Sequence, residues 1–172
     1  MIVQNYCIMD NIMQTGRMSD LDRTDLRLLH ALQRDAQSTA ADLSEALHLS
    51  ASQIGRRRQR LEAEGYITSV TARVDAKKLG LSVQAIVQVQ TGTHDAKTHS
   101  AFRRLVDRQP EIIAAWTLTG EADYMLRVIC TDLVALNRLV QEVLLPHPSV
   151  GRVQSQIVME ELKDATVLPL DI

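Results

Sequence analysis

The chain has 172 residues, enough for one ordinary domain or two small ones, and its 45% hydrophobic content favours a packed core over wholesale disorder. A formal net charge of -2 excludes a uniformly basic nucleic-acid coat, so positive charge has to be sought locally.

Cys7 and Cys130 lie too far apart in the chain to form a pair motif, which favours a reducing compartment, the cytoplasm. No apolar run approaches the roughly 18 residues that a membrane helix needs. Residues 1–18 lack the pattern of a secretory signal and show no clear period, so we interpret them as a mobile extension.

Apolar residues at helical spacing predict two helices near the start of the organised sequence, the first of them within LDRTDLRLLHALQRD. Asp22 or Thr24 can cap the first helix and Ser38 or Thr39 the second, because their side-chain oxygens accept the free amide hydrogens at a helix start. A turn at residues 48–50 then leads into a third helix.

The third helix carries the strongest functional signal in the chain. Ser50 or Ser52 can cap it and Gly65 ends it, while residues 56–60 hold four arginines and no acid. Ile54 and Leu61, seven residues apart, share one face that packs inward, which leaves the other faces open to a partner.

The segment from Tyr66 to Val74 is β-branched and partly alternating, which predicts a short hairpin or wing. Three helices, a tight turn and a wing make a winged helix-turn-helix, whose third helix fits the major groove of DNA. A solvated surface is the simpler interpretation of the arginines taken alone, but the turn spacing and the wing favour DNA binding. The predicted DNA-contacting residues are Thr39, Ser50, Ser52, Gln53, Arg56, Arg57 and Arg60.

The hydrophobic period changes in the second half of the chain. The predicted elements are a strand from Val83, a helix over 95–108, strands from Ile112 and Tyr124, a helix from Leu133 to Val143 and a strand from Val153 to Met159. This βαββαβ order is the split ferredoxin-like arrangement, an antiparallel sheet with both helices on one face, and the fold class is therefore α+β. Because the other face also carries apolar residues, we expect it to bury against a second subunit.

Four motifs resemble the Lrp/AsnC family of leucine-responsive, or feast/famine, transcriptional regulators over about residues 20–165. They are LDRTDLRLLHAL, LSASQIGRRRQRLEAEGYI, TLTGEADYMLRV and QSQIVMEELKD. The resemblance implies a regulator that binds double-stranded DNA, dimerises through its βαββαβ domain, often assembles as an octamer, and binds a small amino-acid effector between subunits. The expected organisation is an extension (1–18), a winged helix-turn-helix (19–75), a linker (76–82), a ferredoxin-like dimerisation and effector-binding domain (83–165) and a C-terminal tail (166–172).

The resemblance also assigns effector-site residues one at a time. Gly120 and Asp123 match the family's G-x-x-D turn, where glycine permits a positive φ and a carboxylate can accept from an α-ammonium group. Val134 and Gln156 stand where family members contact or respond to the effector, and Thr119 is a weaker candidate. The alternative for Asp123 is a turn acid that only stabilises the loop.

The chain departs from the family at Arg58, where members usually have Val or Ile at an inward position. We expect the stem of Arg58 to pack while its head reaches solvent or an acid. The five histidines are scattered and no catalytic motif occurs, so we predict no catalytic residue, metal site or cofactor. Two alternatives are a sirohaem-decarboxylase-like enzyme and an amino-acid sensor without DNA binding, and the arginine-rich helix disfavours both.

Overall fold

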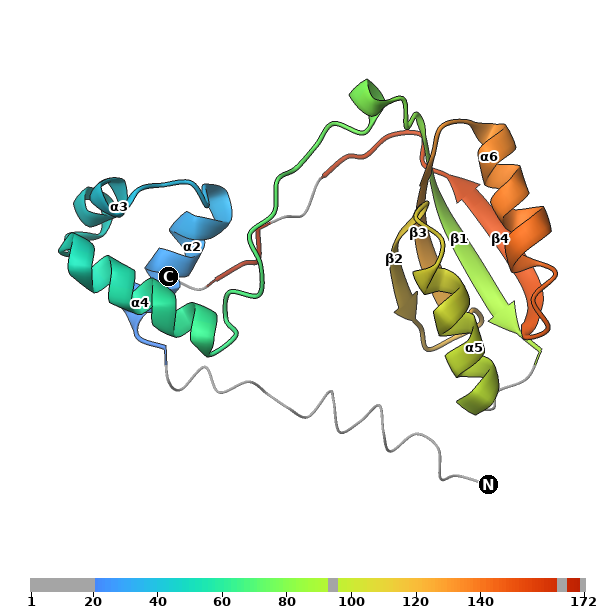
Figure 1. Ribbon diagram of the computed structural model, residues 1–172, viewed down its shortest axis with the longest axis horizontal. Coiled ribbons are helices and arrows are strands. Elements are labelled where there is room, and N and C mark those ends of the chain that lie inside the picture. The colour runs from blue at the N-terminus through green and yellow to red at the C-terminus, as the bar shows by residue number, and fades with distance from the viewer. Residues whose placement is uncertain (1–20, 93–95, 164–166, 171–172) are drawn as a thin grey trace. The chain divides into compact units, whose positions relative to one another are not determined.

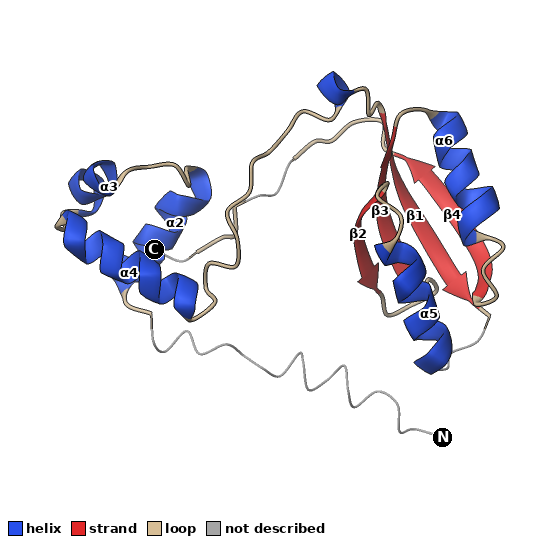
Figure 2. Cartoon of the chain, in the orientation of Figure 1, coloured by secondary structure: helices blue, strands red, loops and turns tan. Residues whose placement is uncertain are grey.

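The computed structural model describes residues 21–92, 96–163 and 167–170. The expected N-terminal extension therefore lies outside the described residues. The chain separates into two units: Arg73–Lys163 form one, and the described residues up to Ala72 form the other together with residues 167–170. Figure 1 follows the chain through both units, and Figure 2 shows that the first is helical while the second contains the sheet.

The first unit contains three helices, each started by a capping box in which a side chain at the cap and another three residues later satisfy each other's backbone amides. They are α2 (Arg23–Arg34), α3 (Ala40–Leu47) and α4 (Ala51–Ala63). Asp22, Thr39 and Ser50 are the caps, as three of the predicted alternatives. His48 takes a left-handed conformation (φ 56°) in the tight turn between α3 and α4. A small aliphatic core holds the three helices together: Leu28, Leu43, Leu47, Ile54 and Leu61.

The segment at residues 66–74, predicted to form a short hairpin or wing, contains no strand. Its start is tied to α4 by a hydrogen bond from the Ile67 amide to the Leu61 carbonyl, 3.1 Å long. Beyond that point Val70 and Val74 are 57% and 72% exposed. A β-branched sequence forms a ladder only where a second strand lies beside it, so the local pattern was misleading here.

The second unit has the predicted βαββαβ order. Its elements are β1 (Val83–Thr91), α5 (Ala96–Asp107), β2 (Ile112–Thr117), β3 (Tyr124–Cys130), α6 (Leu133–Arg138), which continues as a π-helix (Leu139–Leu144), and β4 (Val150–Ile157). The sheet is antiparallel, in the order β2-β3-β1-β4. Both helices cover one face, as Figure 2 shows, and share one apolar core with β1 and β3. The α+β prediction is confirmed.

β4 begins three residues earlier than predicted, at Val150, because Thr91 of β1 pairs with it there. Gly151 makes this possible: a β-carbon at that position would lie 3.3 Å from the Gly92 backbone nitrogen. Glycine interrupts an alternating hydrophobic pattern, so the pattern does not reveal the first three residues of this strand. The part of the chain that the structure describes contains no helix long and apolar enough to cross a membrane.

Candidate DNA-binding surface and effector site

The buried apolar residues of α4 show which face of the helix points inward, and the outward face lies opposite them. Ile54 and Leu61 are buried, and at 100° per residue the opposite side of the helix carries Ser52, Arg56 and Gln59. All three are exposed. Within the described residues Arg56 forms no ion pair, so its guanidinium is available to a phosphate or a base edge. Gln59 was not predicted, although its spacing from Ser52 and Arg56 would have found it.

Arg57 and Arg60 both pair with acidic side chains at the start of α2, and the Arg60 side chain remains 41% exposed. One Arg57 nitrogen, Nη1, lies 2.7 Å from Asp22 Oδ2 and 2.6 Å from Asp25 Oδ1. Arg60 pairs with the other oxygen of Asp25. Hydrogen bonds to Asp25 and then to Asp22 raise the pKa of the Arg57 guanidinium above its usual value. The physical reason is position: Arg57 follows Ile54 by three residues and therefore borders the inward face.

The remaining predicted residues of this surface serve first as caps. The amide of Gln53 donates to Ser50 Oγ at 3.3 Å, and the Ser50 amide donates back to Gln53 Oε1 at 2.9 Å. Thr39 Oγ1 accepts in the same way from the Asp42 amide at 3.2 Å. These side chains are exposed, so capping leaves them at the surface.

Arg58, the departure from the family pattern, reaches an acid as expected. Its Nε lies 3.0 Å from Glu62 Oε1, one turn further along α4. Its side chain is 34% exposed, which fits a packed stem with an accessible head. The buried-charge penalty is therefore avoided.

Asp123 fastens the turn between β2 and β3 to the end of β1. Its Oδ2 accepts from the Thr91 amide at 2.6 Å and from Thr91 Oγ1 at 2.8 Å. Its own amide donates to the Val89 carbonyl at 3.0 Å. Gly120 in the same turn has φ 128°, a conformation that favours glycine. The carboxylate thus fastens the turn within the chain, and its role toward an effector stays a prediction.

The structure does not bring all the predicted effector residues together within one chain. Thr119 and Gly120 lie exposed before β3 begins, whereas Val134, 77% exposed, follows its other end. Seven strand residues at about 3.3 Å each separate these positions by roughly 20 Å. Gln156 is exposed on the sheet face that the helices leave uncovered, paired with Ile86. A site that uses all these residues requires a second chain.

A small hollow of about 30 Å³ adjoins the Gly120–Asp123 turn on that uncovered face. Glu121 and Ala122 of the turn form one side of it, and glutamines and Arg152 form the rest. Arg152 Nη1 lies 3.7 Å from Glu121 Oε1. Arg152 and Glu121 beside the hollow are a cation and a carboxylate, the two kinds of partner that the charged groups of an amino acid require, whereas the hollow itself has room for only about one or two waters.

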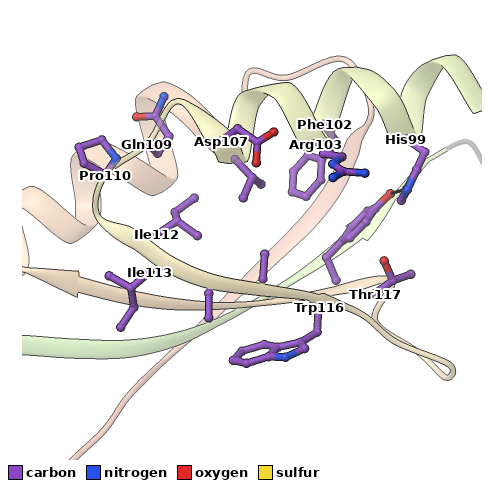
Figure 3. A pocket seen from close by; sticks show the side chains of 14 residues that line it. His99, Phe102, Arg103, Asp107, Gln109, Pro110, Ile112, Ile113, Trp116 and Thr117 are labelled. Carbon is purple, nitrogen blue, oxygen red and sulfur yellow. Dashed lines mark hydrogen bonds between the residues drawn. The ribbon is translucent and has the colours of Figure 1, made fainter. Parts of the chain in front are cut away.

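A larger groove of about 590 Å³ lies between α5 and the edge strand β2 (Figure 3). Phe102, Arg103 and Asp107 approach it from α5, while Trp116 projects from the opposite side of β2 in Figure 3. His99 Nδ1 and Tyr124 Oη lie 2.5 Å apart at one end. Burial, followed by the charge of Asp123, raises the pKa of Tyr124. None of the predicted effector residues lines this groove.

Two family profiles match the two units. Residues 21–68 match a winged helix-turn-helix DNA-binding domain, and residues 84–168 match the Lrp/AsnC ligand binding domain. The DNA-binding transcriptional activator DecR of Escherichia coli is 31% identical over 88% of this chain and 99% of its own length. The glutamate uptake regulatory protein of Zymomonas mobilis is 35% identical over 87% of this chain and 91% of its own.

Solved structures agree with these relatives. The complex of the transcriptional regulator NMB0573 of Neisseria meningitidis with L-Met has a TM-score of 0.83 and 34% identity, covering 87% of this chain and 96% of that one. Escherichia coli AsnC, with a TM-score of 0.79 and 22% identity over 87% and 99% of the two chains, shows the shared fold. The chain belongs to the Lrp/AsnC family of DNA-binding transcriptional regulators.

Proposed function

We propose that the chain recognises its DNA sites through the outward face of α4, with Ser52, Arg56 and Gln59 toward the base edges. The observation that carries the proposal is that this face is exposed and holds an arginine with no ion-pair partner among the described residues. A helix in the major groove presents such side chains to bases, since arginine pairs with guanine and glutamine with adenine. Ser50, Gln53 and Thr39 flank this face as the exposed caps of α4 and α3.

The DNA proposal is tested by selection from a random duplex pool with the full chain, followed by affinity measurement on the recovered site. Arg56→Ala is expected to weaken binding to that site by roughly 1–3 kcal/mol. Arg34→Ala is the matched control, because it removes an exposed arginine from the last turn of α2 instead. Equal losses in the two variants would contradict a reading role for Arg56.

We further propose that a free amino acid is the effector and that it binds beside the Gly120–Asp123 turn. Support comes from the paired charges of Arg152 and Glu121 at the adjoining hollow. It also comes from the relative that was solved with L-Met. A thermal-shift screen of the twenty amino acids tests this, because a ligand that prefers the native state raises its stability by mass action.

The separation of Val134 from the turn supports a site completed by another subunit. We propose that the uncovered sheet face forms a dimer and that the dimer places two copies of α4 on half-sites about one helical turn, or a multiple, apart. Light scattering on the full chain is expected to give at least a dimer. Met125→Lys, on that face opposite Trp116, is expected to shift it toward monomer. A monomer in the unmodified chain would refute this assembly.

A further inference from the structure

Asp25 is a completely buried carboxylate in the DNA-binding unit, with a relative exposure of 0%. A charged group is rarely buried in so small a core unless other groups satisfy it. It belongs to α2, whereas the side chains that face DNA in the proposed function belong to α4. Its burial therefore calls for a reason beyond capping its own helix.

Every partner of Asp25 can be traced. The Asp22 amide donates to Oδ2 at 3.1 Å and completes the capping box. Arg57 donates to Oδ1 at 2.6 Å, and Arg60 donates to Oδ2. One buried carboxylate thus holds two guanidinium groups that are neighbours on the same side of α4.

Asp42 shows that capping alone needs neither burial nor arginine. It occupies the same position of the capping box in α3, three residues after Thr39. It is exposed, and among the described residues no arginine pairs with it. What distinguishes Asp25 is therefore its attachment to α4.

We propose that Asp25 is a positioning residue of the recognition helix: it fixes the rotation of α4 about its axis and keeps Arg57 and Arg60 away from DNA phosphates. The proposal rests on the proposed function of α4. The apolar contacts of Ile54 and Leu61 are non-directional, whereas two charged hydrogen bonds to one carboxylate set an angle. The angle decides which side chains reach the base edges.

The same arrangement should affect the affinity for the selected DNA site differently from the affinity for DNA of any other sequence. Without Asp25, Arg60 loses its partner on α2 and Arg57 keeps only its hydrogen bond to Asp22. Long arginine side chains freed in this way could reach phosphates, and phosphate contacts add affinity for every sequence alike. A buried ion pair gives little net stability against its desolvation cost, so orientation is the larger gain from such a cluster. Removing the carboxylate is therefore expected to alter the ratio of the two affinities.

The test compares full-length Asp25→Asn with the matched control Asp42→Asn. Each protein is titrated, over a range of salt concentrations, with the site selected by the unmodified chain and with a scrambled duplex. Asp25→Asn is expected to bind the site about 10-fold or more weakly. Its affinity for the scrambled duplex is expected to hold or rise, with a salt slope steeper by up to about one for each arginine that gains a phosphate. Asp42→Asn is expected to keep the ratio of the unmodified chain.

An unchanged ratio in folded Asp25→Asn, or equal losses on both duplexes, would overturn the proposal. If Asp25→Asn loses its helical circular dichroism, Arg60→Gln provides the decisive measurement. The proposal expects no change in the salt slope on scrambled DNA, because Arg60 is held by Asp25. A slope reduced by about one would place Arg60 on a phosphate and refute it. If the unmodified chain selects no sequence at all, the proposed function fails instead.

Discussion

Replacing Asp123 by alanine should destabilise the sheet unit, because this carboxylate holds the β2–β3 turn on the end of β1. The change removes the acceptor for two hydrogen bonds from Thr91, at 2.6 and 2.8 Å, and Thr91 is only 8% exposed. A hydrogen bond to a charged group contributes about 1.5–3 kcal/mol, so the expected loss in the free energy of unfolding is roughly 3 kcal/mol. Asp123→Asn has a side chain of the same shape and keeps one acceptor oxygen, so its loss in the free energy of unfolding should be smaller.

Urea unfolding followed by tryptophan fluorescence measures this loss in the correct unit, because the chain has a single tryptophan, Trp116, on β2. Asp107→Ala, which removes an exposed acid at the end of α5, is the control and should stay within about 0.5 kcal/mol of the unmodified chain. Thr91→Val combined with Asp123→Ala should cost less than the sum of the single changes. If Asp123→Ala matches the control, the carboxylate does not fasten the turn and is available to an effector instead.

Three further outcomes follow from local contacts. Leu61→Ala opens the small helical core where Leu61 is fully buried; it should cost about 2–4 kcal/mol in a helical melt and leave Trp116 fluorescence unchanged. Burial raises the pKa of the Cys130 thiol, so in a variant whose other cysteine is serine it should react with a thiol reagent at pH 8 only after unfolding; rapid native reaction would contradict the packing. Hydrogen bonds from Thr39 lower the pKa of Asp42, and a hydrogen bond from the Ala135 amide lowers the pKa of Asp132. Both ionised carboxylates therefore stabilise the fold above about pH 4, and this stabilisation is lost as the pH falls through their lowered pKa values. An acid titration followed by helical circular dichroism should show the loss.

Features set by neighbouring residues were predictable from the sequence. The caps Asp22, Thr39 and Ser50 each act on amides within their own first turn, so the sequence narrowed each cap to two neighbouring candidates, one of which is the observed cap. The βαββαβ order followed in the same way from changes of hydrophobic period. The family resemblance then gave the function that the comparisons show.

Features set by distant residues were not predictable. Nothing near Asp25 in sequence reveals that two arginines more than 30 positions later surround it. The positive charge of Arg57 led to the prediction that it contacts DNA. Only its angle around α4 relative to the buried Ile54 indicates that it borders the helical core and pairs with Asp25. The segment from Tyr66 to Val74 had strand propensity, but among the described residues it forms no strand.

The central claim is that the outward face of α4 lies against DNA, and site-specific photo-crosslinking tests it most directly. A photoreactive amino acid is placed at position 59 of α4 or, as a control, at position 34 of α2, and each full-length protein is irradiated on the selected duplex. The account predicts covalent adducts to bases from position 59 and none above background from position 34. Adducts in equal amount from both positions, or none from position 59, would contradict it.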